Sequence, residues 1–385
     1  MLNNQTMKII VIGGSVGGLI TAIALSDQGF DVEIYERSSA DMKGRGAGLV
    51  IQPDMMEYLI EKGISPRAVF GVPALERQVL DEDGRAVLTY ANDTIFTSWN
   101  YIWRQLKAHF NPDKYFYGYE LENLKYGKDS VVANFKNGET RIADLVVGAD
   151  GYNSVVREYI VPKREPQYAG YVAFRGLIPE EEMTKEKIDF FANRFSIYPY
   201  ENSHLLCYLV PGPNGELTPG KRLFNWVWYL NKSHHALEKL MTDKNGLTRK
   251  YTVPAGFLSE ENLQGLQEMA EKQLPPILRD SVLQTKHPFV QVIVDLAVPV
   301  MYKDRVCILG DAAFVVRPHT ASGTAKAYRD ALALANSLRE HQVLETALKQ
   351  WNEQEKMYAT ALIIHGKQLA FRSQLGFTSQ IIQSE

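Results

Sequence analysis

The sequence predicts an α/β protein: a Rossmann-like domain carrying an inserted, mostly antiparallel β-sheet, with helices at its C-terminal end. Three observations lead to this fold class. The chain opens as strand, glycine-rich turn, helix and strand. Its middle third is rich in aromatic and β-branched residues separated by Pro and Gly, as antiparallel strands are. A buried strand and a long helical stretch then follow.

The opening unit spans about 30 residues. "MKIIVI" (7–12) is a short apolar run typical of a buried parallel strand, and "DVEIYE" (31–36) reads as the next strand. Between them, "LITAIALSDQGF" has helical spacing and ends at Gly29. This β-α-β context gives weight to the glycine-rich turn "VIGGSVGG".

That turn departs from the G-x-G-x-x-G pattern, because one glycine is replaced in either possible register. One register places Gly13, Ser15 and Gly18 at the three positions, and the other places Ile12, Gly14 and Gly17 there. We prefer the first, since the turn glycine should follow the strand directly. Gly13 then makes the turn and Gly18 packs helix on strand, while Ser15 and Val16 face a pyrophosphate at the helix N-terminus. Ser15 is tolerated if its φ is negative.

An acidic residue ends the second strand. Glu36 is placed to accept hydrogen bonds from ribose hydroxyls, and Arg37 follows it. The unit therefore predicts a dinucleotide site, but the same pattern serves NAD and FAD. An ordinary β-α turn rich in small residues is the alternative.

The remaining elements suggest a divided chain. Hairpins are expected at Asp83-Gly84 and at Asn137-Gly138. We expect a discontinuous nucleotide-binding domain, a substrate domain and a C-terminal helical segment. The first comprises 1–70, 96–165 and 296–345, the second 71–95 and 166–295, and the third 346–385.

Composition excludes several classes of protein. The formal net charge is −3 and no basic block is present, so nucleic acid is not expected as a partner. Cys207 and Cys307 both lie in apolar runs and are expected in the core. His234-His235 lacks a third ligand nearby, so no metal site is predicted. No secretory signal and no membrane span is apparent, which favours a cytoplasmic protein.

Two further motifs indicate which of the two cofactors, NAD or FAD, is bound. "LVVGADGYNSVVR" contains Asp150-Gly151, and "RVCILGDAAFVVRPHTASGTAKAYRDA" contains Gly310-Asp311. With the glycine-rich turn before them, these motifs resemble those of the single-component flavoprotein aromatic hydroxylases of the p-hydroxybenzoate hydroxylase type, over roughly residues 8–345. The resemblance implies FAD as cofactor. It also implies NADH or NADPH as a transient reductant, and O2 and a small aromatic ring as substrates, with oxygen transferred through a flavin C4a-hydroperoxide.

The resemblance also assigns residues. Asp311 would accept a hydrogen bond from a flavin ribityl hydroxyl, and Asp150 would support both the flavin side and the reductant side. The loop after Asp311 would meet the flavin pyrimidine edge through small residues and backbone N–H groups; its members are Pro318, Ala321, Ser322, Gly323 and Thr324. Taken singly, Asp150 can equally be a strand-end turn residue and Asp311 a helix N-cap.

One segment departs from the family. Its usual R-x-x-L-x-x-x-L arginine, which faces the flavin phosphates, is replaced here by Trp99-x-x-Ile102-x-x-x-Leu106. Arg104 or Arg45 can take its place.

Substrate contacts are expected between the flavin loop and the aromatic sheet. His319 is a candidate to bind a ring oxygen or hold its proton, with a structural loop histidine as the alternative. Arg175 is a candidate for the flavin or a substrate oxyanion, with a surface ion pair as the alternative. Four aromatic residues are further candidates, although strand positions of this kind also fit plain core: Tyr198, Tyr208, Trp226 and Trp228.

Several functions share these motifs. The first hypothesis is hydroxylation of a hydroxylated N-heteroaromatic ring. Others are hydroxylation of another activated aromatic such as a phenolic acid or quinone precursor, a flavin oxidase or reductase, and a non-catalytic flavin-binding module. A homodimer is compatible with all of them.

Overall fold

A six-stranded sheet forms the first layer of the computed structural model, which describes residues 7–42, 47–66, 70–127 and 129–376. The strands run parallel except at one edge, where β17 pairs antiparallel with β18. The predicted strands 7–12 and 31–36 are confirmed as β1 and β2. In spatial order the strands are β17 (Tyr302–Lys303), β18 (Val306–Ile308), β10 (Leu145–Gly148), β1 (Lys8–Ile12), β2 (Asp31–Glu36) and β6 (Tyr115–Tyr117).

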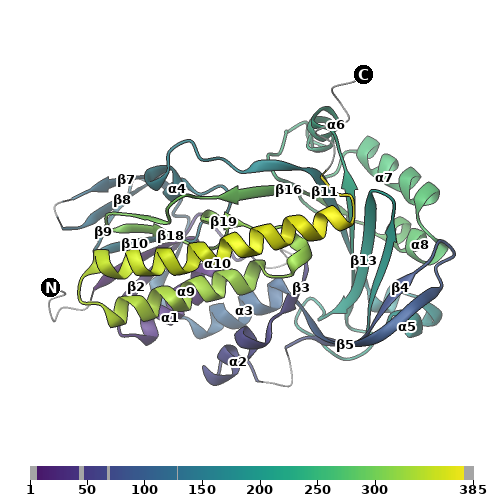
Figure 1. Ribbon diagram of the computed structural model, residues 1–385, viewed down its shortest axis with the longest axis horizontal. Coiled ribbons are helices and arrows are strands. Elements are labelled where there is room, and N and C mark those ends of the chain that lie inside the picture. The colour runs from purple at the N-terminus through teal and green to yellow at the C-terminus, as the bar shows by residue number, and fades with distance from the viewer. Residues whose placement is uncertain (1–6, 43–46, 67–69, 128, 377–385) are drawn as a thin grey trace.

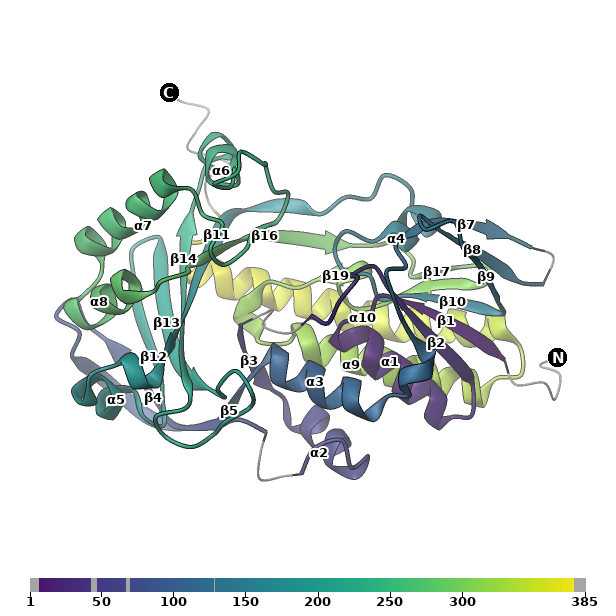
Figure 2. The same ribbon diagram turned by 180° about the vertical axis from the view of Figure 1, so that it is seen from behind.

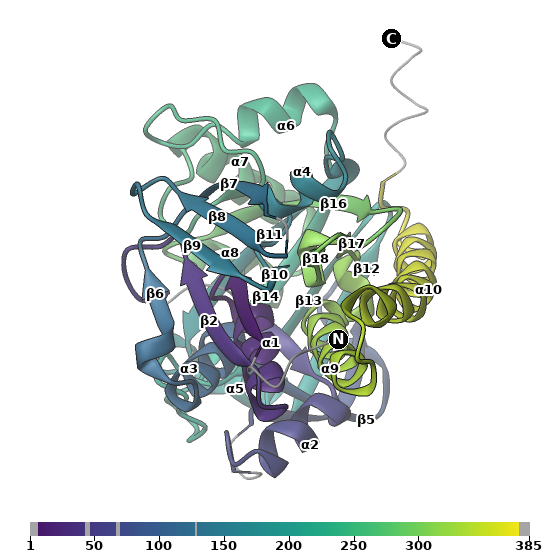
Figure 3. The ribbon, with the colours of Figure 1, turned by 90° about the vertical axis from the view of Figure 1, so that its left-hand side faces the viewer.

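Helices cover one face of this sheet. α1 (Val16–Asp27) packs against α3 (Trp99–His109) and α9 (Gly323–Glu340), and α10 (Leu344–Arg372) packs along α9. Figure 1 and Figure 3 both show α9 and α10 side by side, and Figure 1 shows α10 extending from the six-stranded sheet toward the second layer. The long helix predicted after residue 322 is confirmed as α9. Because α10 packs on α9, the C-terminal helix is part of this layer.

Next to the six-stranded sheet lies a smaller one. It contains β7 (Leu121–Tyr126), β8 (Val131–Phe135) and β9 (Thr140–Ala143), and α4 (Val155–Ile160) contacts β7, β10 and β18. The β8–β9 hairpin turns at Asn137-Gly138, as the sequence predicts.

The second layer is a ten-stranded sheet, antiparallel except where β12 pairs with β4. The β4–β5 hairpin turns at Asp83-Gly84, as predicted. β3, expected in the nucleotide domain, instead pairs with β5 at the edge of this sheet. In spatial order the strands are β15 (Thr252–Val253), β16 (Phe289–Ala297), β11 (Gln167–Pro179), β14 (Leu223–Asn231), β13 (Ser203–Val210), β12 (Arg194–Tyr200), β4 (Val72–Leu80), β5 (Ala86–Ser98) and β3 (Gly48–Ile51), with β19 (Phe314–Val315) pairing β16.

Short helices complete this layer. Figure 2 shows α7 and α8 against the outer side of the large sheet, away from the six-stranded sheet. Leu266 of α7 and Leu278 of α8 are buried there against the tryptophans of β14. The helices of the second layer are α5 (Lys185–Phe191), α6 (His234–Leu240), α7 (Glu260–Gln273) and α8 (Pro276–Gln284), whereas α2 (Pro53–Glu61) packs into the core of the first layer. The 3-10 turns of the chain are η2 (Pro112–Lys114), η3 (Glu180–Glu182), η4 (Gly310–Ala312) and η5 (Pro318–Thr320).

Both cysteines are buried and free, Cys207 in β13 and Cys307 in β18, which confirms them as core residues. Among the residues that the structure describes, no helix combines the length and apolar character that a membrane crossing requires. In the same residues no three His, Cys, Asp or Glu side chains gather in a way that could hold a metal ion.

Candidate active site

Three turns meet at one edge of the six-stranded sheet. β1, β10 and β18 are parallel neighbours, so their carboxyl ends lie together, with Ile12, Gly148 and Ile308 in register. The backbone joins the turns that follow: Ala149 N–H donates to Ile12 O at 2.8 Å, and Leu309 N–H to Gly148 O at 3.0 Å. Open α/β sheets bind ligands in the crevice at this edge. The turns carrying Ser15, Asp150 and Asp311, far apart in sequence, line one cavity there.

The glycine-rich turn has the geometry of the preferred register. Gly13 has φ +104°, a conformation suited to glycine, and it directly follows β1. A Cβ at Gly18 would lie 1.8 Å from the Gly13 carbonyl oxygen, so only glycine allows this close packing of helix on turn. Ser15 has φ −72°, which any residue adopts, and its side chain makes no capping hydrogen bond. Ser15 and Val16 line the cavity.

Glu36 is tied to the same turn. Its Oε2 accepts a 2.8 Å hydrogen bond from Gly14 N–H, and its Oε1 accepts one of 2.8 Å from Ser38 N–H. The carboxylate is buried, lines the cavity and keeps further lone pairs for a ligand. Arg37 lines the cavity beside it.

Asp150 presents an unsatisfied oxygen. Its Oδ2 accepts from Val155 N–H at 2.8 Å and from Val156 N–H at 3.3 Å, the start of α4. Its Oδ1 is buried with no partner among the described residues. Burial raises the pKa of this carboxyl, although the hydrogen bonds it accepts act in the opposite direction. A ligand hydroxyl or N–H group would satisfy this atom.

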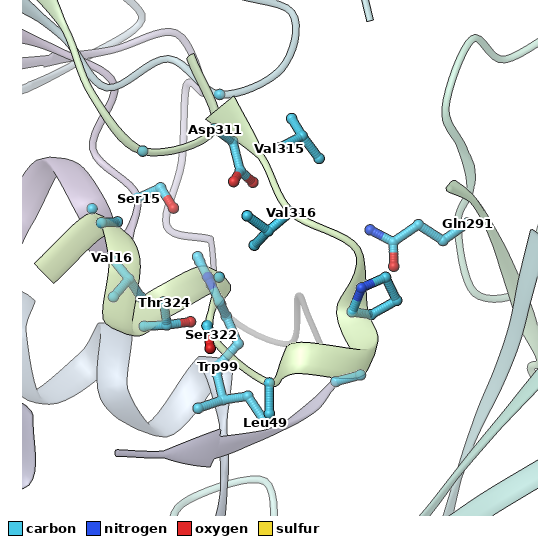
Figure 4. Close-up of a pocket in the computed structure, with 18 of the residues that line it drawn as sticks. Ser15, Val16, Leu49, Trp99, Gln291, Asp311, Val315, Val316, Ser322 and Thr324 are labelled. Atoms are coloured by element: carbon cyan, nitrogen blue, oxygen red, sulfur yellow. The ribbon is translucent and has the colours of Figure 1, made fainter. Parts of the chain in front are cut away.

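Asp311 extends into the cavity from η4. Figure 4 shows its carboxylate facing the space between Ser15, Val316 and Thr324. The surrounding protein raises the pKa of Asp311, which the positive charge of Lys326 opposes. The side chain is open to the cavity and enclosed by protein, as expected for a group that receives a ligand hydroxyl.

The loop after Asp311 forms one wall. Ala321 is left-handed at φ +53°, an uncommon conformation for a residue with a Cβ, and its carbonyl accepts from Gln52 Nε2 at 3.3 Å. α9 begins directly afterwards and has no acidic residue in its first turn, as is also true of α1. Both helix N-termini therefore favour an anion. All five predicted flavin-edge residues line the cavity: Pro318, Ala321, Ser322, Gly323 and Thr324.

The cavity is large enough for a dinucleotide and a small ring together. Its volume is about 1760 Å³, above the range of roughly 300–1,000 Å³ usual for a single small ligand. The half next to the six-stranded sheet carries Glu36, Asp150 and Asp311 with the start of α1. These donors and acceptors suit the ribose, ribityl and pyrophosphate groups of FAD.

In the segment 99–106, where the family usually has an arginine, a tryptophan lies at the cavity instead. Trp99 itself lines it and stacks on Trp103, with ring centroids 6.1 Å apart. Trp103 Nε1 donates to the Gly14 carbonyl at 3.0 Å, so α3 supports the glycine-rich turn. Arg104 is partly exposed outside the cavity, with its nearest hydrogen bond to Pro213 O. Arg45 lies outside the described residues.

The opposite wall is the ten-stranded sheet. His319 joins a group of rings there: its Nε2 lies 2.9 Å from the Tyr171 hydroxyl, and its ring centroid is 5.2 Å from that of His204 and 4.7 Å from that of Tyr229. Burial, with repulsion from a protonated His204 and from Arg317, lowers the pKa of His319 to about 3. The imidazole is therefore neutral at ordinary pH.

Of the residues expected at the substrate, three line the cavity and three do not. His319, Arg175 and Tyr208 line it. Tyr198, Trp226 and Trp228 face the other side of the sheet, where they are buried under α7 and α8. Trp226 Nε1 donates to Thr285 Oγ1 at 2.8 Å there. The interpretation of these three as substrate contacts is therefore corrected: Val227, between the tryptophans, is the residue that faces the cavity.

Sequence reasoning missed several lining residues. They come from strands on the cavity face: Arg77, His204, Tyr229 and Gln291. His204 could have been found from Tyr208, because residues four apart on a strand share a face. Figure 4 shows Gln291 projecting from β16 toward the flavin-edge loop.

The fold, the three carboxylates at the crevice and the N-termini of α1 and α9 beside them are features of a flavin-binding oxidoreductase. A family model described as "FAD binding domain" matches residues 6–175, and one described as "FAD binding domain-like" matches residues 168–295. The chain is 34% identical over 376 residues to 2,6-dihydroxypyridine 3-monooxygenase of Paenarthrobacter nicotinovorans, over 97% of this chain and 94% of that protein. It belongs to the family of FAD-dependent monooxygenases, and FAD is its cofactor.

Other relatives agree. The chain is 26% identical over 399 residues to 6-hydroxynicotinate 3-monooxygenase of Pseudomonas fluorescens, over 94% of this chain and 91% of that protein. The structure of 2,6-dihydroxypyridine-3-hydroxylase from Arthrobacter nicotinovorans matches with TM-score 0.90 and 34% identity, over 96% of this chain and 93% of that one. Klebsiella pneumoniae HpxO complexed with FAD and uric acid shares the fold, with TM-score 0.78 and 19% identity over 98% and 90%. The resemblance to the flavoprotein aromatic hydroxylases is confirmed, and within them the similarity to the dihydroxypyridine hydroxylase extends over nearly the whole chain.

Proposed function

We infer that this monooxygenase hydroxylates a hydroxylated pyridine ring, with NADH or NADPH as reductant and O2 as oxidant. The single observation that carries the proposal is the division of one cavity into an acidic, nucleotide-binding half and a half lined by His319, Arg175 and Tyr208. Two relatives named for hydroxypyridine substrates support the ring chemistry. When bound, FAD would accept a hydride and activate O2 for insertion into an aromatic C–H bond.

The residues of this chain would hold the cofactor from three sides. Glu36 would accept from ribose hydroxyls, the start of α1 at Ser15 would face the pyrophosphate, and Asp311 would accept from a ribityl hydroxyl. Asp150 would use its unpartnered Oδ1. The N–H groups at the start of α9 would lie along the flavin loop, where they favour negative charge.

On the substrate side, His319 would handle the proton of the ring hydroxyl. Tyr171 keeps its own proton, because burial holds the pKa of its phenol well above the usual range. Since the Tyr171 hydroxyl occupies Nε2 of His319, the ring atom left for a substrate oxygen is Nδ1. In the neutral imidazole Nδ1 would accept a hydrogen bond from the ring hydroxyl if Nε2–H donates to Tyr171, or donate one to the ring oxygen if Tyr171 donates to Nε2. Arg175 would stabilise the oxyanion, which makes the ring electron-rich enough to be attacked.

Water must be kept from the reacting ring, or reducing equivalents are lost to peroxide. The sheet supplies an apolar lining for this purpose, including Phe195, Leu206, Val227 and Phe289.

The test is a screen of hydroxypyridines and phenols for accelerated NADH or NADPH oxidation, with product masses. The proposal expects a hydroxypyridine to stimulate consumption and to gain one oxygen. A phenolic acid as the preferred substrate would favour the other hydroxylase hypothesis. Peroxide with an unchanged ring would indicate an oxidase, and a yellow protein without turnover would indicate a binding module.

A further inference from the structure

The cavity face of the large sheet is a regular array of side chains. Strand pairing places Phe289, Arg175, Val227, Leu206 and Ile197 in one row across β16, β11, β14, β13 and β12. All five line the cavity. Because side chains alternate between faces, the residues two positions along each strand extend the same wall.

Two arginines on this wall lack counter-charges. Arg77 of β4 and Arg175 of β11 both line the cavity, and the Nε of each is buried without a hydrogen-bond partner among the described residues. Neither forms an ion pair within the described chain. The guanidinium of Arg77 lies over two aromatic rings, 5.0 Å from the centroid of Phe195 and 6.0 Å from that of Tyr90. A partly buried cation normally has an anionic partner, since the unpaired charge is costly.

The acidic side chains that line the cavity lie elsewhere. Glu36, Asp150 and Asp311 belong to the nucleotide half, and Glu120 precedes β7 and pairs with Lys136. Asp93 of β5 is the one described acidic residue that lines the cavity from the large sheet. Asp93 is exposed and forms no ion pair with Arg77 or Arg175. Within the described residues, no carboxylate therefore neutralises the two arginines.

A histidine lies close enough to Arg77 to be affected by its charge. Burial and the charge of Arg77 lower the pKa of His204 to about 4, and its Nδ1 is buried without a partner. The site thus keeps both histidines, His204 and His319, neutral while it holds two guanidinium groups.

We propose that the substrate is bound as an anion whose counter-charge is supplied by Arg77 together with Arg175, and that Arg77 is a specificity-determining residue of the site. β4 and β11 are separated by three intervening strands. Each strand spacing is about 4.8 Å, so the two arginines flank the ring from opposite sides rather than grip one oxygen atom. The ligand class is a pyridine ring bearing an ionised oxygen group. This inference rests on the proposed function, because it describes the same site.

The anionic group can be a ring oxyanion or a carboxylate, and the probes separate them. The holoenzyme is titrated without reductant, and the Kd is read from the change in flavin absorption. The probes are 2,6-dihydroxypyridine and 6-hydroxynicotinate, each with a neutral analogue, 2,6-dimethoxypyridine and 6-hydroxynicotinamide. The variants are Arg77→Met, Arg77→Lys and Arg175→Met, with Arg85→Met at the β4–β5 turn as the matched control.

We expect Arg77→Met to weaken binding of at least one anion by about tenfold to a hundredfold, the range of a hydrogen bond to a charged group. The corresponding neutral analogue should be nearly unaffected, and Arg77→Lys should restore part of the loss. The anion that responds identifies the group as oxyanion or carboxylate. Arg85→Met should bind all four probes like the wild type.

The melting temperature gives an independent readout. A guanidinium kept unpaired for a ligand opposes folding, so ligand-free Arg77→Met should melt at or above the wild-type temperature. A lower melting temperature with equal weakening of neutral and anionic probes would make Arg77 structural and overturn the proposal. Failure of the wild type to bind either anion, or unchanged anion affinity in Arg77→Met, would also overturn it. Failure of the proposed function would look different: ligand binding without consumption of reductant.

Discussion

Asp330 of α9 accepts a hydrogen bond of 2.8 Å from the backbone N–H of Gly310, the residue before Asp311. The same carboxylate pairs with Lys326 at 2.7 Å, and Lys326 in turn donates to the Gly310 carbonyl at 3.0 Å. Both side chains are completely buried. One peptide is thus held on both sides by a buried ion pair, which fixes the turn that carries the flavin-facing carboxylate.

A second carboxyl group makes this arrangement sensitive to pH. Burial and the negative charge of Asp330 raise the pKa of Glu355, on α10, to about 7, which Arg329 opposes. Oδ1 of Asp330 and Oε1 of Glu355 are both buried without a hydrogen-bond partner. A proton on Glu355 would let its carboxyl group donate a hydrogen bond to Asp330. The folded protein therefore holds this proton to a higher pH than the unfolded chain does. Its contribution to stability is complete below about pH 4.5 and is lost as the pH rises through about 7.

Glu355→Gln should flatten this dependence, since an amide donates at every pH. The melting temperature of the wild type should fall relative to that of the variant between about pH 5 and about pH 8. Thermal melts in matched buffers check this, with exposed Glu353→Gln on the same helix as control. Parallel curves for wild type and Glu355→Gln would show that Glu355 does not carry the effect.

Asp311→Ala should release FAD. Loss of a charge-assisted hydrogen bond is expected to weaken FAD affinity by about tenfold to a hundredfold. The measurement is flavin fluorescence that appears when the holoenzyme is diluted. Asp189→Ala, on exposed α5, is the control. A variant that purifies fully yellow and retains FAD on dilution would remove Asp311 from the cofactor site.

Ser15→Gly should leave FAD affinity nearly unchanged. The Ser15 backbone already has an ordinary negative φ, and its hydroxyl caps nothing in the structure. Replacement of an N-cap serine by glycine costs only a few tenths of a kcal/mol. The same dilution assay applies, and a large loss of FAD would identify the hydroxyl as a phosphate ligand.

The two faces of the large sheet should respond differently to substitution. Trp226→Phe removes a buried hydrogen bond and should destabilise the fold by about 1–3 kcal/mol while leaving ligand Kd unchanged. Tyr208→Leu, on the cavity face, should weaken ligand binding instead. Denaturant melts and ligand titrations on the same preparations separate the effects. Weaker ligand binding in Trp226→Phe with normal stability would place the tryptophan at the substrate after all.

The turns that line the nucleotide half of the cavity could be predicted because each one requires particular residues within a short stretch of sequence. Gly13 needs a positive φ, Glu36 ends a strand, and Asp311 follows a buried one, so each leaves a signature in its own stretch of sequence. Their convergence follows from the parallel pairing of β1, β10 and β18, which the local pattern does not show and which only the resemblance to the flavoprotein hydroxylases implied.

The substrate wall was less predictable because both faces of the large sheet are lined by apolar side chains. Trp226 and Val227 are equally apolar, so hydrophobic alternation cannot say which faces the core and which the cavity. Arg77 was not predicted as a site residue for another reason. It lies in a hairpin far from any motif, and only the pairing of β4 with β12 brings it to the site.

The most direct test of the whole account is turnover of a hydroxypyridine with NADH under isotopically labelled dioxygen. The account predicts that the product ring carries one labelled oxygen atom, in proportion to NADH consumed. Stoichiometric peroxide with no label in the ring would contradict it.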